Sequence, residues 1–374
     1  MYATQYGGVL QLQKLLPWNC RIIGAFRIDH HDKIGAFISP RVALQKNLQH
    51  GSFRITWGRA YSIPNLLFQS AQVNGIVFGN GDGISYIPNN SVFSDPASVT
   101  ITQPLKPEEV QTWELGYRGS VVKNMFIDVN YYTGISKNFL TPNLHVGGRA
   151  LRVGNIPVTP AFSGDVINDT LKNASFFTWF NYGKVKVNGL DVGITYSFSN
   201  KISFTTKYSW LNSDITKENM QNDGNRDEYH STEERSLNAP RNRGVAILYS
   251  QNLFQRELFF KIATRFVEQY DFYSGNLIGT AAGEGKRGRV YGGKNPRTEQ
   301  DRWYWKNFDW GPLGGFVSVD LSTGWKLSET TSVAVNVTNL FNAKQRELVS
   351  APFIRRLFSA ELKVHVPEKQ KTKP

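Results

Sequence analysis

The sequence lacks any stretch of the roughly 18 consecutive apolar residues that a membrane-spanning helix needs, and it has no sustained helical periodicity. This excludes a transmembrane helix but not membrane-spanning strands, because such strands show only an alternation of apolar and polar residues. Cys20 is the one cysteine, so the chain cannot form an internal disulfide or a cysteine-based metal cluster. The first residues also lack the basic-then-apolar order of a secretory signal. We therefore expect a chain that starts after such a signal, or a fragment.

Acidic residues are fewer than basic residues, 30 against 43, which gives a formal net charge of +13. An excess of this sign raises nucleic acid as a partner. The basic residues are spread over strand faces and loops instead of forming one dense cluster, so we expect no nucleic-acid partner. Hydrophobic residues make up 40% and aromatic residues 13% of the chain, a composition that favours strands and argues against disorder.

The clearest alternation of apolar and polar residues lies near the end of the chain, in residues 314–366. There Val317, Val319 and Leu321 share one parity, whereas Ser318 and Asp320 take the other. A period of two places these sets on opposite faces of a sheet. The same pattern recurs from the N-terminus onward and predicts 13 strands, each about as long as the strands of a membrane barrel.

The predicted strands are joined by short turns at one end and by longer connections at the other. Four connections have no sustained periodicity and are predicted to be loops: residues 62–107, 136–181, 214–240 and 268–313. Long strands with short turns on one side and long loops on the other are typical of antiparallel transmembrane β-barrels. The pattern thus predicts an all-β transmembrane barrel whose apolar face meets lipid and whose charged face lines the lumen. A soluble all-β protein is the alternative.

Five segments resemble sequence motifs of one known family. They are residues 39–67, which include Arg-Ile-Thr-Trp-Gly-Arg-Ala-Tyr-Ser-Ile-Pro-Asn-Leu; 107–117, Pro-Glu-Glu-Val-Gln-Thr-Trp-Glu-Leu-Gly-Tyr; 187–196, Val-Asn-Gly-Leu-Asp-Val-Gly-Ile-Thr-Tyr; 336–342, Asn-Val-Thr-Asn-Leu-Phe-Asn; and the terminal strand, 356–366. With these segments at these spacings, nearly the whole chain resembles the C-terminal barrel part of TonB-dependent outer-membrane receptors, in particular the kind found in Bacteroidetes-type bacteria.

This resemblance implies a 22-stranded barrel preceded by a plug domain, of which residues 1–366 would be strands 10 to 22 and residues 367–374 a polar tail. Neither a plug nor a box for the energising TonB protein precedes Met1, so we expect a fragment or a separately encoded portion. The implied function is active import across the Gram-negative outer membrane of a large solute, such as a ferric siderophore or an oligosaccharide. A smaller passive channel is the alternative.

The same resemblance sets the expected partners. They are outer-membrane lipid and lipopolysaccharide, the TonB complex acting through the plug, the solute and a surface lipoprotein. We expect no cofactor, no metal site and no enzyme activity.

Two groups of residues are candidates for function. Charges on the predicted lumen face would dock a plug and line a solute path, or would simply be solvated: Arg27, Arg41, Arg54, Glu114, Asp128, Asp191, Lys261, Arg265 and Asp320. Basic and aromatic residues of the last long loop would attract an anionic ligand and stack on its rings, or would form a solvated loop and an aromatic girdle: Arg289, Lys294, Arg297, Trp303, Tyr304 and Trp305.

Overall fold

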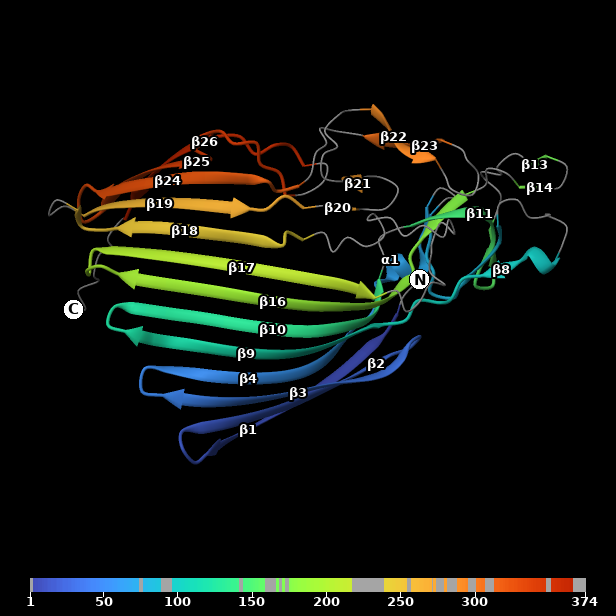
Figure 1. The fold of residues 1–374 in the computed structure, drawn as a ribbon, viewed down its shortest axis with the longest axis horizontal. Coiled ribbons are helices and arrows are strands. Elements are labelled where there is room, and N and C mark those ends of the chain that lie inside the picture. Colours follow the sequence, from blue (N-terminus) through green and yellow to red (C-terminus); the bar gives the residue numbers. More distant parts are fainter. Residues whose placement is uncertain are drawn as a thin grey trace, which may run out of the picture.

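The computed structural model describes residues 3–365, with the exception of 74–76, 89–95, 141–143, 159–165, 168–169, 172–174, 217–238, 254–256, 271, 274–278, 281–287, 295–300, 307–312 and 348–350. Its main feature is one continuous antiparallel sheet of 13 strands, which we call the wall (Figure 1). This confirms the predicted all-β architecture and the predicted number of strands. Within the described residues, no helix is both long enough and apolar enough to cross a membrane.

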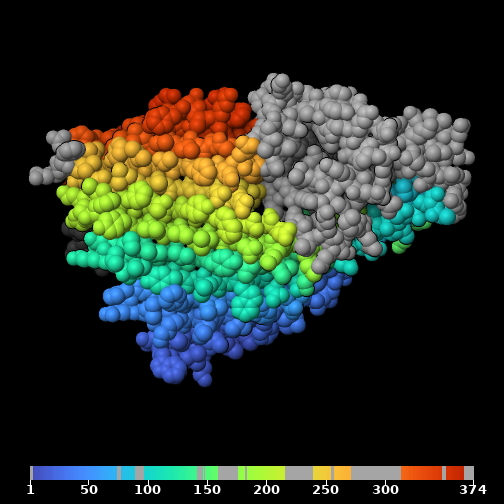
Figure 2. Space-filling model, in the orientation of Figure 1, coloured from blue at the N-terminus to red at the C-terminus, as the bar shows by residue number. Residues whose placement is uncertain are grey.

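The wall strands are, in chain order, β1 (Gln5–Leu16), β2 (Cys20–His31), β3 (Gly35–Leu48), β4 (Gly51–Ser62), β9 (Glu108–Val122), β10 (Met125–Leu140), β16 (Asn181–Ser197), β17 (Ile202–Thr216), β18 (Asn242–Ser250), β19 (Leu258–Val267), β24 (Phe316–Lys326), β25 (Thr331–Thr338) and β26 (Leu357–Val364). Each strand pairs with its neighbours in this order, so successive parts of the chain lie side by side across the wall (Figure 2). β1 and β26 are the two end strands of the sheet.

The two ends of the wall differ as the sequence predicts. At one end, which we call the turn end, the strands are joined by short turns. In one of them Val122 pairs directly with Met125, and the turn residue Asn124 has a φ of 67°. Asparagine tolerates this left-handed conformation, which a two-residue hairpin requires. The opposite end, which we call the loop end, carries the long connections.

The first correction to the sequence analysis concerns the long connections 62–107 and 136–181, which were predicted to be loops. They contain the short helix α1 (Leu66–Ser70), a 3₁₀ turn at Pro96–Ser98 and, besides one two-stranded hairpin, seven strands: β5 (Gln72–Val73), β6 (Val77–Phe78), β7 (Ile84–Pro88), β8 (Thr100–Ile101), β11 (Leu144–Val153), β12 (Ile156–Pro157) and β15 (Ser175–Thr178). Together these strands form a second sheet, the loop-end sheet, in the order β5-β6-β15-β11-β7-β8 with β12 beside β11.

The loop-end sheet encloses the main buried apolar cluster among the described residues. Its members include Phe78, Ile84, Tyr86, Val146 and Phe176, which are at most 3% exposed. The side chain of fully buried Asn80 ties three segments together: it donates to the backbone oxygens of Gln103 and Trp179 and accepts from the Thr102 hydroxyl. Except for β11, these strands are only two to five residues long, too short for their alternation to be recognised, which explains why sequence periodicity missed this sheet.

Short strand pairs also lie in the connections 136–181 and 268–313. β13 (Val166–Ile167) pairs with β14 (Thr170–Leu171), and β20 (Phe272–Tyr273) pairs with β21 (Gly279–Thr280). β22 (Gly288–Lys294) pairs with β23 (Asp301–Lys306), so part of the predicted loop 268–313 is a hairpin. Most of the acidic loop 214–240 lies outside the described residues.

Candidate functional site

The register of the wall determines which side chains share a face, because directly opposed residues of antiparallel strands point to the same side. Starting at Arg27, pairs such as Arg41 with Gly58 and Arg54 with Gly116 can be followed strand by strand to β24. All nine charged residues singled out from the sequence lie on one face, which we call the polar face: Arg27, Arg41, Arg54, Glu114, Asp128, Asp191, Lys261, Arg265 and Asp320. The pairing of β1 with β2 also shows which residues of β1 lie on the polar face, among them Gln11 and Gln13.

The opposite face, which we call the apolar face, carries large hydrophobic side chains that no other part of the described structure covers. Leu12, Ile55, Leu115 and Val335 are between 48% and 67% exposed. Patches of this kind are uncommon on soluble monomers and mark contact with lipid or another protein. The wall is therefore a single layer with one polar and one apolar surface.

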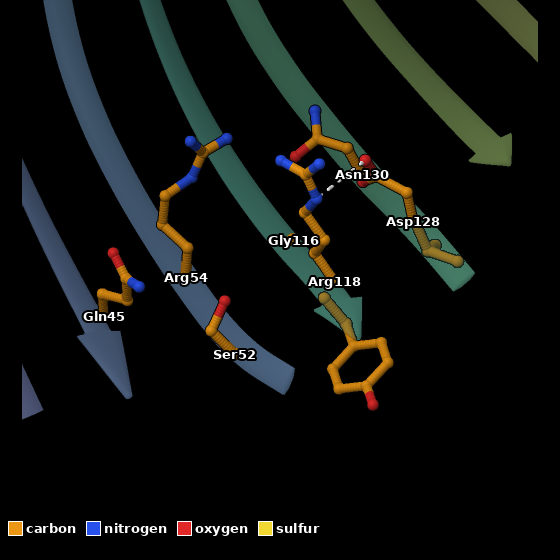
Figure 3. Close-up of a pocket in the computed structure, with 9 residues that line it drawn as sticks. Gln45, Ser52, Arg54, Gly116, Arg118, Asp128 and Asn130 are labelled. Atoms are coloured by element: carbon orange, nitrogen blue, oxygen red, sulfur yellow. Dashed lines mark ion pairs between the residues drawn. The ribbon is translucent and has the colours of Figure 1, made fainter. Parts of the chain in front are cut away.

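A hollow of about 280 Å³ lies in the polar face over β3, β4, β9 and β10, toward the turn end (Figure 3). Arg54, Arg118, Asp128 and Asn130 extend into it from three neighbouring strands, and Gln45 and Ser52 lie at its side. Gly116 leaves space between them, since a Cβ atom there would approach the Asn130 carbonyl oxygen Oδ1 to 3.1 Å. That oxygen is buried and has no hydrogen-bond partner among the described residues.

Ion pairs between neighbouring strands cross this part of the polar face. Arg54 Nη2 lies 3.6 Å from Glu114 Oε2, and Arg118 Nε lies 3.8 Å from Asp128 Oδ2. These distances are long and the side chains are partly exposed, so each pair stabilises the fold by little. The sequence analysis missed Arg118, although it shares the parity of Glu114 on the same strand and could have been found by that signal.

The remaining charges of the polar face differ in how firmly they are held. Arg27 makes a short bidentate pair with Asp29, at 2.6 and 2.7 Å. The Asp320 carboxylate accepts a hydrogen bond from the backbone N–H of Asn339 at 2.8 Å. Arg265 donates to Glu347 at 2.6 Å and to Gln345 at 3.2 Å. Arg265 and Asp320 are thus already engaged by the connection between β25 and β26.

The candidates in the last long connection are only partly described. The backbone register of the β22–β23 hairpin places Arg289 opposite Trp305, Val290 opposite Tyr304 and Tyr291 opposite Trp303. Lys294 is the last residue of β22 and pairs with Asp301. Arg297 lies outside the described residues. The backbone positions of the basic candidates on β22 therefore lie beside those of the aromatic candidates on β23.

In the part of the chain that the structure describes, no three His, Cys, Asp or Glu residues are grouped to hold an ion. What the polar face offers is hydrogen bonds and charges of both signs. Such a surface can hold a polar domain or a hydrophilic solute by non-covalent contacts.

A two-faced sheet of long antiparallel strands, with short turns at one end and large connections at the other, is the wall of an outer-membrane-type β-barrel. The family model described as "TonB dependent receptor-like, beta-barrel" matches residues 3–340. The chain belongs to this family.

Solved structures of similar fold agree with this class. The siderophore receptor PirA from Acinetobacter baumannii superposes with a TM-score of 0.59 at 17% identity, over 97% of this chain and 46% of that protein. The copper transporter OprC gives a TM-score of 0.57 at 13% identity, over 97% and 48%. The FrpB iron transporter from Neisseria meningitidis gives 0.55 at 14% identity, over 97% and 46%. The chain therefore spans a little under half the length of these proteins. No curated protein matches it.

Proposed function

We propose that this chain supplies part of the barrel wall of an active importer in the Gram-negative outer membrane. The importer would take up a large solute, such as a ferric siderophore or an oligosaccharide, and would be energised by TonB through a plug domain. The observation that carries the proposal is the division of the 13-stranded wall into one face that carries the charged residues and one that carries large exposed apolar side chains. Membership of the TonB-dependent receptor barrel family supports it.

The polar face has the chemistry that a plug and a hydrophilic solute need. We assign plug docking or solute contact to Arg27, Arg41, Arg54, Glu114, Asp128, Asp191 and Lys261. In the hollow of Figure 3, Arg54, Arg118 and Asp128 present both charge signs within one small space, which suits a polar segment better than an apolar one. Arg265 and Asp320 instead hold a connection of this chain in place.

At the loop end we assign ligand contact to Arg289, Lys294 and Arg297 by charge and to Trp303, Tyr304 and Trp305 by stacking. The paired backbone positions of β22 and β23 support this grouping. Lipid, lipopolysaccharide and a surface lipoprotein are the further partners of the proposed assembly. Siderophores and iron enter the proposal because PirA is a siderophore receptor and FrpB an iron transporter.

Uptake by cells that express the protein tests the proposal. We expect a radiolabelled ferric siderophore or a fluorescent oligosaccharide to accumulate only when TonB and the proton-motive force are intact. Uptake that persists without TonB would favour the passive channel instead. A chain that stays soluble and monomeric without detergent would contradict both membrane functions and favour a soluble binding protein.

The proposal that the wall is a partial barrel has its own test. In the described structure the end strands β1 and β26 pair only with β2 and β25. We therefore expect the isolated 374-residue chain to show no heat-dependent shift on a gel, because a closed barrel is what resists unfolding in detergent before heating. A clear shift, with stable ion conductance in a planar bilayer, would contradict it.

A further inference from the structure

The connection between β25 and β26 is bonded to the polar face of the wall. We call its described part, residues 339–347 and 351–356, the strap. The strap begins at a tight corner formed by Asn339, which is fully buried. The backbone N–H of Asn339 donates to the Asp320 carboxylate at 2.8 Å, and its side chain donates to the backbone oxygen of Ile354 at 3.0 Å. The corner therefore joins the two ends of the strap to each other and to β24.

Arg265 of β19 attaches the strap to the wall at a second point. Its guanidinium donates to the Glu347 carboxylate at 2.6 Å and to the side-chain oxygen of Gln345 at 3.2 Å, and it lies 5.2 Å from the ring centre of Phe316. Gln345 itself is only 2% exposed. A planar guanidinium that contacts two partners fixes their geometry as well as adding energy. Arg265 thus determines where residues 345 and 347 of the strap lie.

The connection between β19 and β24 provides a third attachment, outside the wall strands. The Tyr270 hydroxyl donates to the backbone oxygen of Glu347 at 3.0 Å, and the backbone N–H of Gly314 donates to the backbone oxygen of Arg346 at 3.1 Å. Burial, and secondarily the charge of Glu347, raises the pKa of the Tyr270 hydroxyl, so it remains a donor at neutral pH. The strap is thus bonded to both ends of the neighbouring connection.

The polar face of β19 and β24 is closed near these attachments and open nearer the turn end. Val267, Phe316 and Ser318, which share this face with Arg265, are at most 5% exposed. Lys261 lies on the same face of β19, closer to the turn end, and is exposed. The contacts of Arg265 together with this burial place the strap over the loop-end part of the face, where it narrows the space that the polar face encloses.

The charged groups next to the strap are already used within the chain, in contrast to those of the hollow in Figure 3. Arg265 and Asp320 are both bonded to strap residues. In the hollow, the oxygen Oδ1 of Asn130 has no hydrogen-bond partner among the described residues, and the Arg118 side chain is 70% exposed. The hollow can therefore bond to a further molecule or domain, whereas the wall beside the strap has little left to offer one.

Opening the strap would break the bonds of Arg265, Tyr270 and Gly314 together and would leave the buried Gln345 without its donor, which costs free energy. We propose that the strap is a fixed inner layer of the wall and not a moving gate, with Arg265 and Tyr270 as the residues that position it. A plug and a solute then meet the rest of the polar face, including the hollow, and the strap stays in place while a solute passes. This inference rests on the proposed function for the passage of a solute, but the fixed attachment of the strap does not.

Hydrogen exchange of the detergent-folded full chain tests the attachment of the strap. We expect the backbone amides of residues 339–347 to exchange far more slowly than those of a free peptide. R265Q should speed this exchange by about tenfold, because it removes two hydrogen bonds, one of them to the buried side chain of Gln345. R265K should give an intermediate rate, because it keeps the charge but not the planar fork.

The matched control is K207Q, which removes an exposed cation from the same face, in the row of paired residues that leads through Val245 to Arg265. It should leave the exchange of the strap unchanged. Y270F keeps the ring and removes one hydrogen bond, so we expect a smaller increase than in R265Q. Exchange at the free-peptide rate in the wild type, or equal rates in R265Q and K207Q, would contradict the fixed attachment.

A chemical tether distinguishes a fixed strap from a gate in cells that express the protein. In a C20S background, which leaves no other thiol, the variant R265C/E347C is joined by a bismethanethiosulfonate reagent with a short spacer. We expect the tethered protein to take up the radiolabelled ferric siderophore or the fluorescent oligosaccharide as well as the wild type does. Loss of uptake on tethering, restored when a reductant cleaves the tether, would show that the strap must open and would overturn the proposal. A strap that is protected from exchange in a wild-type protein that imports neither solute would instead refute the proposed function alone.

Discussion

The wall is antiparallel and the loop-end sheet is antiparallel except where β6 pairs with β15, yet the two sheets place their side chains in opposite ways. In the wall, large apolar residues such as Leu12 and Leu115 are 67% and 52% exposed. In the loop-end sheet, Ile84 and Phe176 are 0% and 1% exposed. The first sheet leaves its apolar face for an external partner, whereas the second encloses its own core.

This difference indicates what stabilises each part. Burial of apolar surface is the main favourable term for a water-soluble core, so the loop-end sheet can be stable in water on its own packing. The wall lacks such a core and depends on its backbone hydrogen-bond ladder and on the medium that covers its apolar face. In lipid, every backbone N–H and C=O group must be hydrogen-bonded inside the protein. Within the wall, hydrogen bonds between neighbouring strands meet this condition.

The largest expected effect comes from removing the central ring of the loop-end sheet. Phe176 packs edge-on against Tyr86 at 5.4 Å and against Phe78 at 6.0 Å. We expect Phe176→Ala to lower the local free energy of unfolding by about 3–5 kcal/mol, because it leaves a cavity in a closed core. Hydrogen exchange of β7 and β11 measures this opening, and exchange in the wall should not change.

The same substitution in the wall is the control. Phe204 on β17 is 37% exposed on the apolar face, so Phe204→Ala leaves no closed cavity and should have a clearly smaller effect. Equal losses at Phe176 and Phe204 would contradict the contrast between the two sheets.

A charge placed on the apolar face tests the medium that covers the wall. Leu115→Arg puts a cation in the middle of β9, where a membrane barrel loses about 2–4 kcal/mol near the bilayer centre. The reduced stability is measured by urea unfolding from lipid vesicles. Thr112→Arg is the matched control, because it lies on the polar face of the same strand between Gly58 and Gly134, where a long side chain has space. An effect of equal size at both positions would argue against lipid on the apolar face.

The same contrast explains how much could be predicted from the sequence. The wall was predictable because its long strands repeat a period of two, so that Val317, Val319 and Leu321 separate cleanly from Ser318 and Asp320. The loop-end sheet was not, because β5, β6 and β8 are two residues long and because β6 and β7 pair with strands of the other long connection, β15 and β11. Its order is set by tertiary contacts such as those of Asn80, which leave no local pattern.

The candidate site was predictable to a similar extent. Parity placed Arg54, Glu114 and Asp128 together, and the register agrees with that grouping. Parity could not reveal that Arg265 holds Glu347, since that contact joins residues 82 positions apart in the chain. It could not reveal the hollow around Gly116 either, because the hollow depends on which side chains of four strands happen to be small.

The smallest expected effect concerns the charges of the polar face. Arg54 and Glu114 are 47% and 29% exposed, and their closest atoms are 3.6 Å apart. We expect Glu114→Gln to cost at most about 1 kcal/mol of stability in urea unfolding, with the loss disappearing in concentrated salt, because water and ions screen the pair. Glu361→Gln on end strand β26 makes the same chemical change where the structure shows no ion pair among the residues it describes, and should cost less. If Glu114→Gln instead cost as much as Phe176→Ala at all salt concentrations, the polar face would have to be a dry interior, and an open surface ready to receive a plug or a solute would be ruled out.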